Sequence, residues 1–462
     1  MTIEQLFESQ RKNSWNLRTA PLHERVEGLK KLSLWIESHQ DQICQAMSED
    51  FGKPEMEVLM TEIYPVLQEI HYAMKNLKKW ARPQKVSPPL LLVGTKNAIY
   101  YEPKGVVLII APWNYPFNLA MIPVVAALAA GNCVILKPSE LTPKTSQLME
   151  DMLSSIFAPN HVLVAQGDKD ISTKLLSLPF DHIFFTGSTQ VGKIVMKAAS
   201  EHLSDVTLEL GGKSPAIIDS SADLDWTAQK IAWGKFVNAG QTCLAPDYLF
   251  VDSEIYGVFM EKLKHQLEVL YKDPAKDLAR VISSRHLQRL SSLFNEALSA
   301  GAKLVYGGQF DFQKNTLSPT VIDQVPVTTQ VMLEEIFGPL LPVLKFNNLN
   351  ETIEFVNARP KPLSFYIFSK NKANVDRLLA ATTAGGVCVN DSVIHFANHN
   401  LPFGGVGESG LGNYHGHYGF KTFSHSKSVL KQSALGRLLN LIYPPYTPWK
   451  IKLAKFLIRW KI

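Results

Sequence analysis

The stretch NAGQTCLAPDY contains the cysteine that is best placed for chemistry. Gly240, Gln241 and Thr242 precede Cys243 and Pro246 follows it, which predicts a loop whose backbone N–H groups approach the sulfur. A cysteine reacts as its thiolate, so local dipoles of this kind favour a nucleophile. A structural loop cysteine is the alternative. The other cysteines lie in apolar helical or strand patterns and are predicted to be core residues: Cys44, Cys133 and Cys388.

A carboxylate in the stretch LELGGKSP could serve as a general base. Glu209 lies between two leucines at the end of a predicted strand, just before the flexible pair Gly211-Gly212. Apolar neighbours desolvate a carboxylate and make it more basic, so that it can deprotonate water. An outward-facing strand residue that takes no part in catalysis is the alternative.

Two other strand ends carry residues suited to a nucleotide. In FFTGSTQVGK a predicted strand runs into Gly187 and then into a predicted helix that contains Gly192, so a phosphate could approach N–H groups at the positive end of the helix. This spacing is neither GxGxxG nor a P-loop, and a tight turn is the alternative. In LKPSE, Lys137 and Glu140 follow another strand, where each could hold a ribose hydroxyl or simply belong to a solvated loop.

The elements that must position these residues alternate in type from about residue 95 onward. Short β-rich segments separated by helical stretches run from GVVLIIAP to SPAIIDSS, and a second series follows the cysteine from DYLFVDS to GGVCVND. Apolar strands that alternate with helices predict parallel sheets covered on both faces. The predicted fold class is therefore α/β, with two Rossmann-like parallel-sheet domains and a boundary near Leu210-Gly211-Gly212. Before residue 95, apolar residues spaced by three and four predict a helix over 22–36.

An uncharged run extends from Gly105 to Leu136 and is long enough to cross a membrane. Three prolines within it argue against a continuous membrane helix. We predict instead a buried strand at 106–110, a turn at 111–116, a helix through VVAALAAG and a second strand at CVILKP. Ligands of open α/β sheets bind at the carboxyl ends of strands, and Asn114 falls there.

Composition and charge indicate an ordinary globular enzyme. The 462 residues are 46% hydrophobic and 19% charged, and their number suits two or three domains. Widely spaced cysteines without a CxxC pair, and a polar N-terminal stretch without an apolar signal segment, predict a reducing, cytoplasmic setting. The net charge is +5, but residues 431–462 carry seven basic and no acidic residues, which leaves −2 for the first 430. This near-neutral body gives no indication of nucleic-acid binding.

The basic tail predicts an amphipathic helix in YPPYTPWKIKLAKFLIRWKI. Thr447 can cap this helix and Pro448 suits its first turn. It is too short and too charged to span a bilayer, but it suits reversible, peripheral contact with a membrane. Docking on a dimer partner or over a substrate entrance is the alternative. One face is apolar, with Trp449, Leu453, Phe456, Leu457 and Trp460, and the opposite face is basic, with Lys452, Lys455 and Arg459.

Seven motifs, in order along the chain, resemble those of the aldehyde dehydrogenase superfamily: PWNYPF, KPSE, FTGS, LELGGKSP, GQTC, EEIFGP and LPFGGVGESGLG. The resemblance extends from about residue 10 to residue 430. The short N-terminus and GQTCLAPDY are similar to the class 3 branch, which includes fatty and medium-chain aldehyde dehydrogenases. This resemblance implies a homodimer that uses NAD, with NADP also accepted.

The resemblance implies a role for each motif. Cys243 resembles the nucleophile, Glu209 the general base, and Asn114 the donor that stabilises an oxyanion together with the Cys243 backbone N–H. Trp113 differs from the phenylalanine more often found at this position, which alters the shape of the pocket. The implied cofactor contacts are Lys137 and Glu140 at the adenosine ribose, Gly187 and Ser188 in the pyrophosphate-binding turn with Gly192 in the helix that follows, Glu335 at the nicotinamide ribose, and Phe337 beside the nicotinamide.

The activity implied by the resemblance is the oxidation of aldehydes, medium or long-chain aliphatic or aromatic, to carboxylic acids. It proceeds through a thiohemiacetal and a thioester on the cysteine. Two alternatives are a CoA-acylating relative, in which CoA resolves the thioester, and a catalytically idle structural or membrane-associated dimer. Glu209 favours water over CoA, and the intact set of Cys243, Glu209 and Asn114 argues against the idle dimer.

The resemblance also adds a small oligomerisation β-extension to the two sheets. The glycines of LPFGGVGESGLG predict a loop that lines a substrate entrance or a domain contact. His415 and His417 lack the third ligand that a catalytic metal normally needs, so we expect no metal there. The expected division is an NAD(P)-binding domain at 1–82 and 106–210, oligomerisation and bridging segments at 83–105 and about 400–430, a catalytic domain at 211–399, and a basic amphipathic tail at 431–462.

Overall fold

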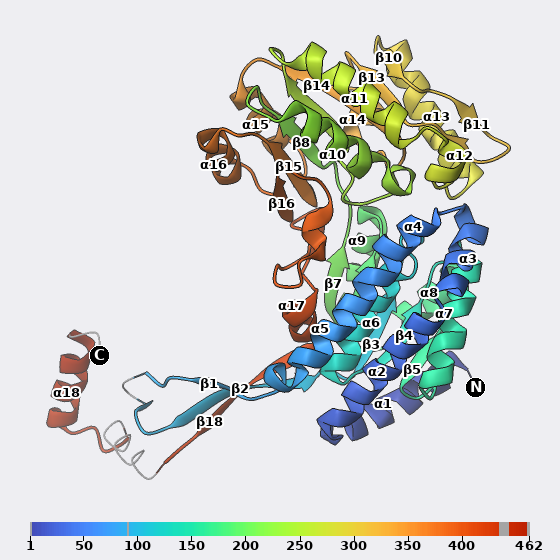
Figure 1. The fold of residues 1–462 in the computed structure, drawn as a ribbon. Coiled ribbons are helices and arrows are strands. Elements are labelled where there is room, and N and C mark those ends of the chain that lie inside the picture. Colours follow the sequence, from blue (N-terminus) through green and yellow to red (C-terminus); the bar gives the residue numbers. More distant parts are fainter. Residues whose placement is uncertain (1, 90–91, 434–442, 460–462) are drawn as a thin grey trace.

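The computed structural model describes residues 2–89, 92–433 and 443–459. Residues 106–209 supply all but one strand of its first parallel sheet (Figure 1). The strands of this sheet are β3 (Val106–Ile110), β4 (Cys133–Lys137), β5 (Val162–Val164), β6 (His182–Thr186), β7 (Asp205–Glu209) and, from far along the chain, β17 (Gly410–Leu411). They follow the order β17-β7-β6-β3-β4-β5, with β17 antiparallel to β7 and the other pairs parallel. Without β17 this is the strand order of a Rossmann sheet, which binds its ligand where the order reverses, between β3 and β6.

Helices cover both faces of this sheet. Those that connect its strands are α6 (Asn118–Ala130), α7 (Pro143–Ile156), α8 (Lys169–Leu176) and α9 (Thr189–Ser200). The helix predicted over 22–36 is confirmed, because Leu29, Leu32 and Ile36 are buried on one face of it. The N-terminal helices are α1 (Ile3–Thr19), α2 (Leu22–Ser38), α3 (Gln40–Phe51), α4 (Glu55–Val58) and α5 (Tyr64–Trp80), with a π-helical turn at Leu59–Ile63.

The uncharged run forms β3, α6 and β4, but the helix is longer than predicted. It begins at Asn118 and contains Pro123, whereas the prediction began it after this proline. Pro123 cannot donate to the Leu119 carbonyl one turn earlier. All residues of α6 except Leu119 are buried, so packing around the helix keeps it intact. Within the described residues, no helix has both the length and the apolar character needed to cross a membrane.

The second sheet has seven strands: β8 (Pro215–Ile218), β9 (Tyr248–Asp252), β10 (Lys303–Tyr306), β13 (Thr320–Asp323), β14 (Leu340–Phe346), β15 (Ser364–Phe368) and β16 (Gly386–Val389). Their order is β10-β13-β14-β9-β8-β15-β16, and β10 is antiparallel to its neighbour while the others are parallel. The prediction of two Rossmann-like parallel sheets in an α/β fold is therefore confirmed.

Helices also pack on the second sheet, and a two-stranded hairpin lies at its side (Figure 1). The hairpin consists of β11 (Phe310–Asp311) and β12 (Thr316–Leu317). The helices are α10 (Leu224–Phe236), α11 (Tyr256–Leu270), α12 (Pro274–Asp277), α13 (Ser284–Ser299), α14 (Gln330–Leu333), α15 (Leu349–Asn357) and α16 (Lys372–Ala381), with 3-10 turns at Val237–Gly240 and Ile394–Ala397.

A third, antiparallel sheet projects from the first half of the molecule (Figure 1). It joins β1 (Gln84–Val86), β2 (Lys96–Pro103) and β18 (Ser424–Lys431). Before β18, α17 (Gly416–Thr422) packs against α5 and α6. After it, α18 (Pro448–Arg459) begins at the predicted proline. The Thr447 hydroxyl does not cap α18, because it has no hydrogen-bond partner in the part of the chain that the structure describes.

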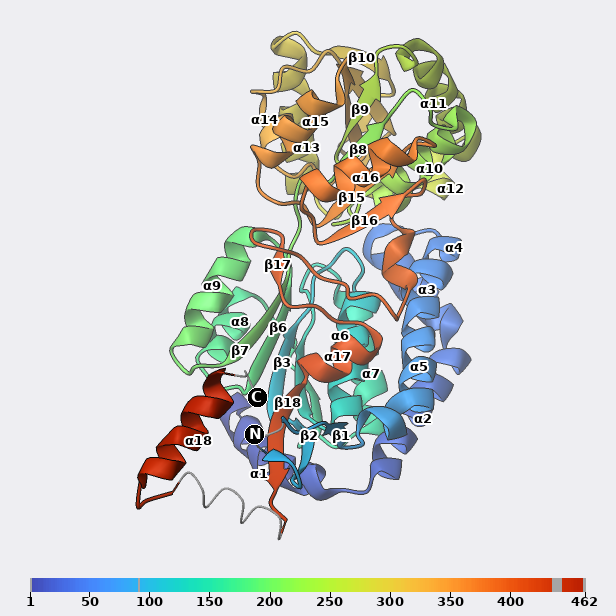
Figure 2. The same cartoon turned by 90° about the vertical axis from the view of Figure 1, so that its left-hand side faces the viewer.

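The carboxyl edge of the first parallel sheet faces the amino edge of the second. β7 continues through residues 210–214 into β8, so the chain passes straight from one sheet to the other. The first sheet presents the carboxyl ends of β3, β6 and β7, and the second presents the segments that precede β9 and β14. Figure 2 shows this junction between the lower and upper halves of the molecule.

Candidate active site

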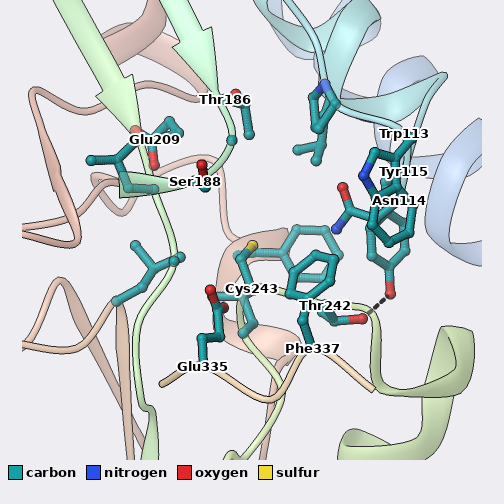
Figure 3. A pocket seen from close by; sticks show the side chains of 18 of the residues that line it. Trp113, Asn114, Tyr115, Thr186, Ser188, Glu209, Thr242, Cys243, Glu335 and Phe337 are labelled. Carbon is teal, nitrogen blue, oxygen red and sulfur yellow. Dashed lines mark hydrogen bonds between the residues drawn. The ribbon is translucent and has the colours of Figure 1, made fainter. Parts of the chain in front are cut away.

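A cavity of about 520 Å³ lies where the two sheet edges meet. Three residues predicted to bind the cofactor lie outside its lining: Lys137, Glu140 and Gly192. Figure 3 shows the remaining predicted side chains gathered around Cys243. The predicted residues that line the cavity are Asn114, Gly187, Ser188, Glu209, Cys243, Glu335 and Phe337.

The loop that carries Cys243 has an unusual, left-handed backbone. Asn238, Ala239 and Gly240 have φ values of 55°, 53° and 69°. For the two residues with side chains this conformation costs free energy, which is typical of functional sites. Gly240 admits no side chain, because a Cβ atom there would lie 2.4 Å from the Gly338 carbonyl oxygen. The loop places Cys243 in the cavity just before β9 begins.

The thiol of Cys243 is held in its protonated form by its surroundings. Burial raises its pKa, and the nearby carboxylates of Glu335 and Glu209 raise it further. The backbone N–H groups of Cys243 and Leu244 act in the opposite direction and lower it. These two groups are the backbone dipoles expected from the loop sequence.

Asn114 is buried and is held by one hydrogen bond from its side chain and one to its backbone. Its Nδ2 donates to the Gln241 carbonyl at 2.9 Å, and its backbone carbonyl accepts from Nδ2 of Asn238 at 2.8 Å. An amide nitrogen carries two N–H bonds, so the second can serve a ligand in the cavity. Figure 3 shows this amide facing the same space as Cys243.

A buried network supports both residues from behind. The hydroxyls of Tyr115 and Thr242 lie 2.8 Å apart, which links the residue after the amide to the residue before the thiol. Lys53 lies 3.7 Å from the centre of the Tyr115 ring and 2.6 Å from Glu62. The Glu62 carboxylate accepts backbone N–H groups at the start of α6. These contacts fix the Asn114 and Cys243 segments relative to each other.

Glu209 ends β7 as a buried and unpaired carboxylate. The residue is 3% exposed, and its neighbours Leu208 and Leu210 are buried as well. Neither of its carboxylate oxygens has a hydrogen-bond partner among the described residues. This burial raises the pKa of Glu209 well above its ordinary value. A strongly basic carboxylate that faces a cavity is suited to remove a proton from water.

Three charged residues hold the EEIFGP turn in place. Lys213 pairs with Asp247 at 2.5 Å, and Asp247 accepts the N–H of Ile336 at 3.1 Å. Arg289 of α13 donates to the carbonyls of Glu335 and Ile336. Lys213 belongs to LELGGKSP, Asp247 follows GQTC, and Ile336 belongs to EEIFGP. These contacts therefore join three of the predicted motifs.

Glu335 and Phe337 face the first sheet from this turn. A Cβ atom on Gly211 would lie 2.2 Å from a Glu335 carboxylate oxygen, so the close approach requires glycine. Burial raises the pKa of Glu335 to about 8, and Asp247 adds to this shift. The Phe337 ring packs edge-on against Trp113, with ring centres 5.3 Å apart. Trp113 therefore forms part of the wall, as its departure from phenylalanine indicated.

The residues that could bind a nucleotide lie along the carboxyl edge of the first sheet. Gly187 and Ser188 join β6 to α9, and the Ser188 hydroxyl accepts the N–H of Val191 at 3.4 Å. The amino end of α9 thus carries a partial positive charge beside the cavity, which suits a phosphate. At the end of β4, Nζ of Lys137 is buried and lies 3.2 Å from the half-exposed Glu140 carboxylate.

Gly192 is closely packed. It lies within α9, outside the cavity lining, where a Cβ atom would come within 2.8 Å of the Leu210 side chain. Close packing of α9 against the segment after β7 therefore favours glycine here, and the cofactor contact expected from the sequence stays a prediction.

Several cavity residues carried no local sequence signal. His286 and Arg289 come from α13, and Trp233 comes from α10. Phe403 belongs to LPFGGVGESGLG and lines the cavity, while Gly410 of the same motif pairs with Glu209. The segment therefore both lines the cavity and pairs with the last residue of β7. Further apolar wall residues are Leu363, Val393, Phe396 and Tyr414.

Most of the chain matches known proteins. The aldehyde dehydrogenase family matches residues 1–429. Aldehyde dehydrogenase family 3 member H1 of Arabidopsis thaliana is 44% identical over 94% of this chain and 90% of its own length. The dimeric, NADP-preferring aldehyde dehydrogenase of Canis lupus familiaris is 42% identical over 93% of this chain and 94% of its own. The substrate-bound structure of Staphylococcus aureus AldH is 42% identical, with a TM-score of 0.95 and coverage of 99% of this chain and 100% of that one.

The two Rossmann-like sheets enclose a cysteine beside a sheet edge that could bind a nucleotide. This arrangement is typical of an oxidoreductase that uses a nucleotide cofactor. The chain belongs to the aldehyde dehydrogenase family, and its similarity to family 3 members confirms the class 3 resemblance. It is an NAD(P)-dependent enzyme that oxidises aldehydes, as the motifs predicted.

Proposed function

We propose that Cys243, Asn114 and Glu209 carry out a hydrolytic aldehyde oxidation. The observation that carries this proposal is that one cavity holds a thiol, an amide with an available N–H and a buried carboxylate without a partner. Bound NAD(P) supplies the oxidation, because its nicotinamide accepts a hydride. The residues that would hold it are Lys137, Glu140, Gly187, Ser188, Gly192, Glu335 and Phe337.

In the first step the Cys243 thiol gives up its proton to solvent, its sulfur bonds to the aldehyde carbon, and the carbonyl oxygen takes up negative charge. Nδ2 of Asn114 and the backbone N–H of Cys243 stabilise this oxygen, and one such donor is typically worth about 10²–10³ in rate. The tetrahedral carbon of the thiohemiacetal can lose hydride, which a planar aldehyde carbon does not do readily. Loss of hydride leaves an acyl thioester on Cys243.

In the second step Glu209 accepts a proton from water, and the water oxygen attacks the thioester carbon. The carbon–sulfur bond breaks, the acid leaves and the sulfur of Cys243 is regenerated. A deeply buried carboxylate suits a molecule as small as water. This favours hydrolysis over transfer of the acyl group to CoA.

NADH formation with hexanal, measured with and without CoA, tests this function. We expect the same rate in both conditions, with hexanoic acid as the product. A rate that requires CoA would indicate the acylating reaction, and no NADH in either condition would indicate the idle dimer.

The wall of the cavity supports medium or long-chain aliphatic or aromatic aldehydes as substrates. Its apolar side chains include Trp233, Phe396 and Phe403. Burial of one CH₂ is worth about 0.8 kcal/mol, so kcat/KM should rise by up to about fourfold for each added methylene until the cavity is filled. A series from acetaldehyde to hexadecanal measures this, and a flat or falling series would contradict it.

Glu140 should give the enzyme a preference for NAD, because a carboxylate repels the 2′-phosphate of NADP. In Glu140→Ala, that repulsion is lost and Lys137 is released from its ion pair. We expect the ratio of kcat/KM for NADP over NAD to rise by about tenfold, which corresponds to about 1.4 kcal/mol. Glu201→Ala, an exposed carboxylate at the far end of α9, serves as the control. Equal kcat/KM for both cofactors in the wild type would contradict the assignment.

We further propose a homodimer, with 1–82 and 106–210 as the NAD(P)-binding domain, 211–399 as the catalytic domain and the β1-β2-β18 sheet as the oligomerisation element. This sheet projects from the body of the molecule, and the Canis lupus familiaris relative is named as dimeric. Sedimentation equilibrium tests the proposal, and a monomer at micromolar concentration would contradict it.

The tail is proposed to bind anionic membranes reversibly. Figures 1 and 2 show α18 standing away from the two parallel sheets. Trp449 is 53% exposed and Ile458 is 77% exposed, although such side chains are usually covered. Trp460 of the predicted apolar face lies outside the described residues, as do the basic residues Arg437 and Lys461.

The full-length protein should sediment with phosphatidylglycerol vesicles at low salt and much less at high salt. Each basic residue near the surface contributes about 1 kcal/mol at low salt. A version that ends at Tyr446 should remain in the supernatant. If both proteins stay in the supernatant at low salt, the membrane proposal is wrong.

A further inference from the structure

His415 and His417 lie two residues apart in the sequence but have different partners. The His417 ring stacks on Trp80 of α5, with ring centres 5.4 Å apart. His415 lies instead against Glu69 of the same helix, with its Nδ1 3.8 Å from a carboxylate oxygen. A pair formed by the two histidines is therefore excluded, and His415 belongs to another cluster.

A third residue from a distant segment completes this cluster. Nδ1 of His399 lies 2.8 Å from the Glu69 oxygen that faces His415. One donor atom from each of the three residues lies within 4.8 Å of the other two. The side chains of Glu69 and His415 are 1% and 4% exposed, whereas that of His399 is 16% exposed. The cluster is thus buried on two sides and reaches solvent through His399.

His415 contributes a nitrogen with no assigned partner. Its buried Nδ1 forms no hydrogen bond with any residue that the structure describes. The backbone of His415 has a φ of 77°, which costs free energy in a residue other than glycine. Strain and an unsatisfied buried polar atom each need compensation, and both point to a missing ligand between the ring and Glu69.

We propose that Glu69, His399 and His415 bind one divalent transition-metal ion such as Zn²⁺, with water as a fourth ligand. Two imidazoles and one carboxylate form a donor set that suits this ion. Tetrahedral coordination with bonds of about 2.0–2.1 Å places ligand atoms about 3.4 Å apart. The separations from Glu69, 2.8 Å and 3.8 Å, lie on either side of this value, and the two histidine nitrogens lie within 4.8 Å of each other, so side-chain rotations must bring the three atoms to it.

Binding requires the other tautomer of His399. The contact between His399 and Glu69 is an N–H···O hydrogen bond, so Nδ1 of His399 must give up its proton before it coordinates, and a neutral imidazole does this by taking up a proton on Nε2. The other Glu69 oxygen keeps the hydrogen bond that it accepts from the Gly416 N–H at 2.7 Å. This bond orients the carboxylate for the ion, much as outer hydrogen bonds orient ligands in known metal sites.

The cluster lies directly behind the wall of the active-site cavity. His415 belongs both to the cluster and to the lining of the cavity. A bound ion would fix the His415 ring and join α5 to the two loops that carry the histidines. We therefore expect occupancy to change the KM for long aldehydes more than kcat, since no residue of the cluster contacts the reacting sulfur in the proposed mechanism.

Titration of the full-length protein with Zn²⁺ by calorimetry, and with Co²⁺ by visible absorption, tests the proposal. Cys243→Ala is titrated beside the wild type, because a thiolate also binds these ions. We expect one ion per chain in both proteins, with the absorption of tetrahedral Co²⁺ and without a thiolate-to-cobalt band. Zn²⁺ should also raise the KM of the wild type for hexanal, and EDTA should reverse this.

Two variants and a matched control locate the site. His399→Gln and Glu69→Gln should each weaken binding by at least about tenfold, the loss typical even of residues that only support a ligand. His71→Gln removes an exposed histidine of α5 that lies 3.6 Å from Glu37, and it should bind Zn²⁺ as the wild type does. Melting temperatures of the metal-free proteins show which variants keep the fold, and His399→Gln is the milder because His399 is partly exposed.

Three results would overturn the proposal. These are the absence of stoichiometric binding at micromolar Zn²⁺, binding that is equally tight in His399→Gln, and binding that disappears in Cys243→Ala. The last result would place the ion on the catalytic thiol.

Discussion

Replacement of Cys243 by alanine is expected to reduce aldehyde oxidation by at least about 10⁴-fold, since loss of the nucleophile costs a serine protease about 10⁶-fold. Among the described residues that line the cavity, Cys243 is the one thiol, and it lies beside the available amide of Asn114. Alanine is smaller than cysteine and leaves the loop and its left-handed turn intact. NADH formation with hexanal measures the loss, and the Kd for NAD measured in parallel should change little.

A second cysteine provides the control for this experiment. Cys44→Ala replaces another free, partly buried thiol, but in α3 and away from the cavity. This variant should keep nearly all of the activity. Turnover above a few per cent of the wild type in Cys243→Ala would show that another group forms the covalent bond.

Glu209→Gln should uncouple the two steps of the reaction. Glutamine keeps the size of the side chain but cannot take a proton from water, and general-base catalysis is typically worth about 10²–10⁴ in rate. The acylation step does not need this base, so the variant should release a burst of NADH of about one equivalent per site and then stall. Stopped-flow absorbance separates the burst from the steady state.

The pH dependence of the steady-state rate gives an independent check on Glu209. A folded-state pKa raised by burial keeps the carboxyl protonated over a wider pH range, so the base form increases as the pH rises through that raised value. The wild-type deacylation rate should therefore rise with pH, and Glu209→Gln should lack this rise. Glu201→Gln, which alters an exposed carboxyl directly after α9, should behave as the wild type. An undiminished steady-state rate in Glu209→Gln would mean that another base acts.

Local sequence was sufficient to predict the strands of the first sheet and the candidate residues at their ends. β3 and β4 are runs of buried apolar residues, and such runs read as strands that are covered on both faces. Asn114, Gly187 and Glu209 each follow or end a strand of the first sheet, where its ligands are expected to bind. The Cys243 loop could be predicted as well, because its glycine, polar residues and proline disfavour helix and strand.

The sequence by itself determined the α/β class, the two sheets and the family, because burial periodicity and ordered motifs are local properties of the chain. Only the tertiary structure decided how these pieces meet. The second sheet turns its amino edge toward the first, which brings Cys243 and Glu335 to a cavity that no strand-end rule predicted. Pro123 lies inside a helix because surrounding packing outweighs its local cost. His415 meets Glu69, 346 positions earlier in the numbering, instead of its neighbour His417. Contacts of this kind depend on strand order and on the packing of distant segments, which local patterns do not encode.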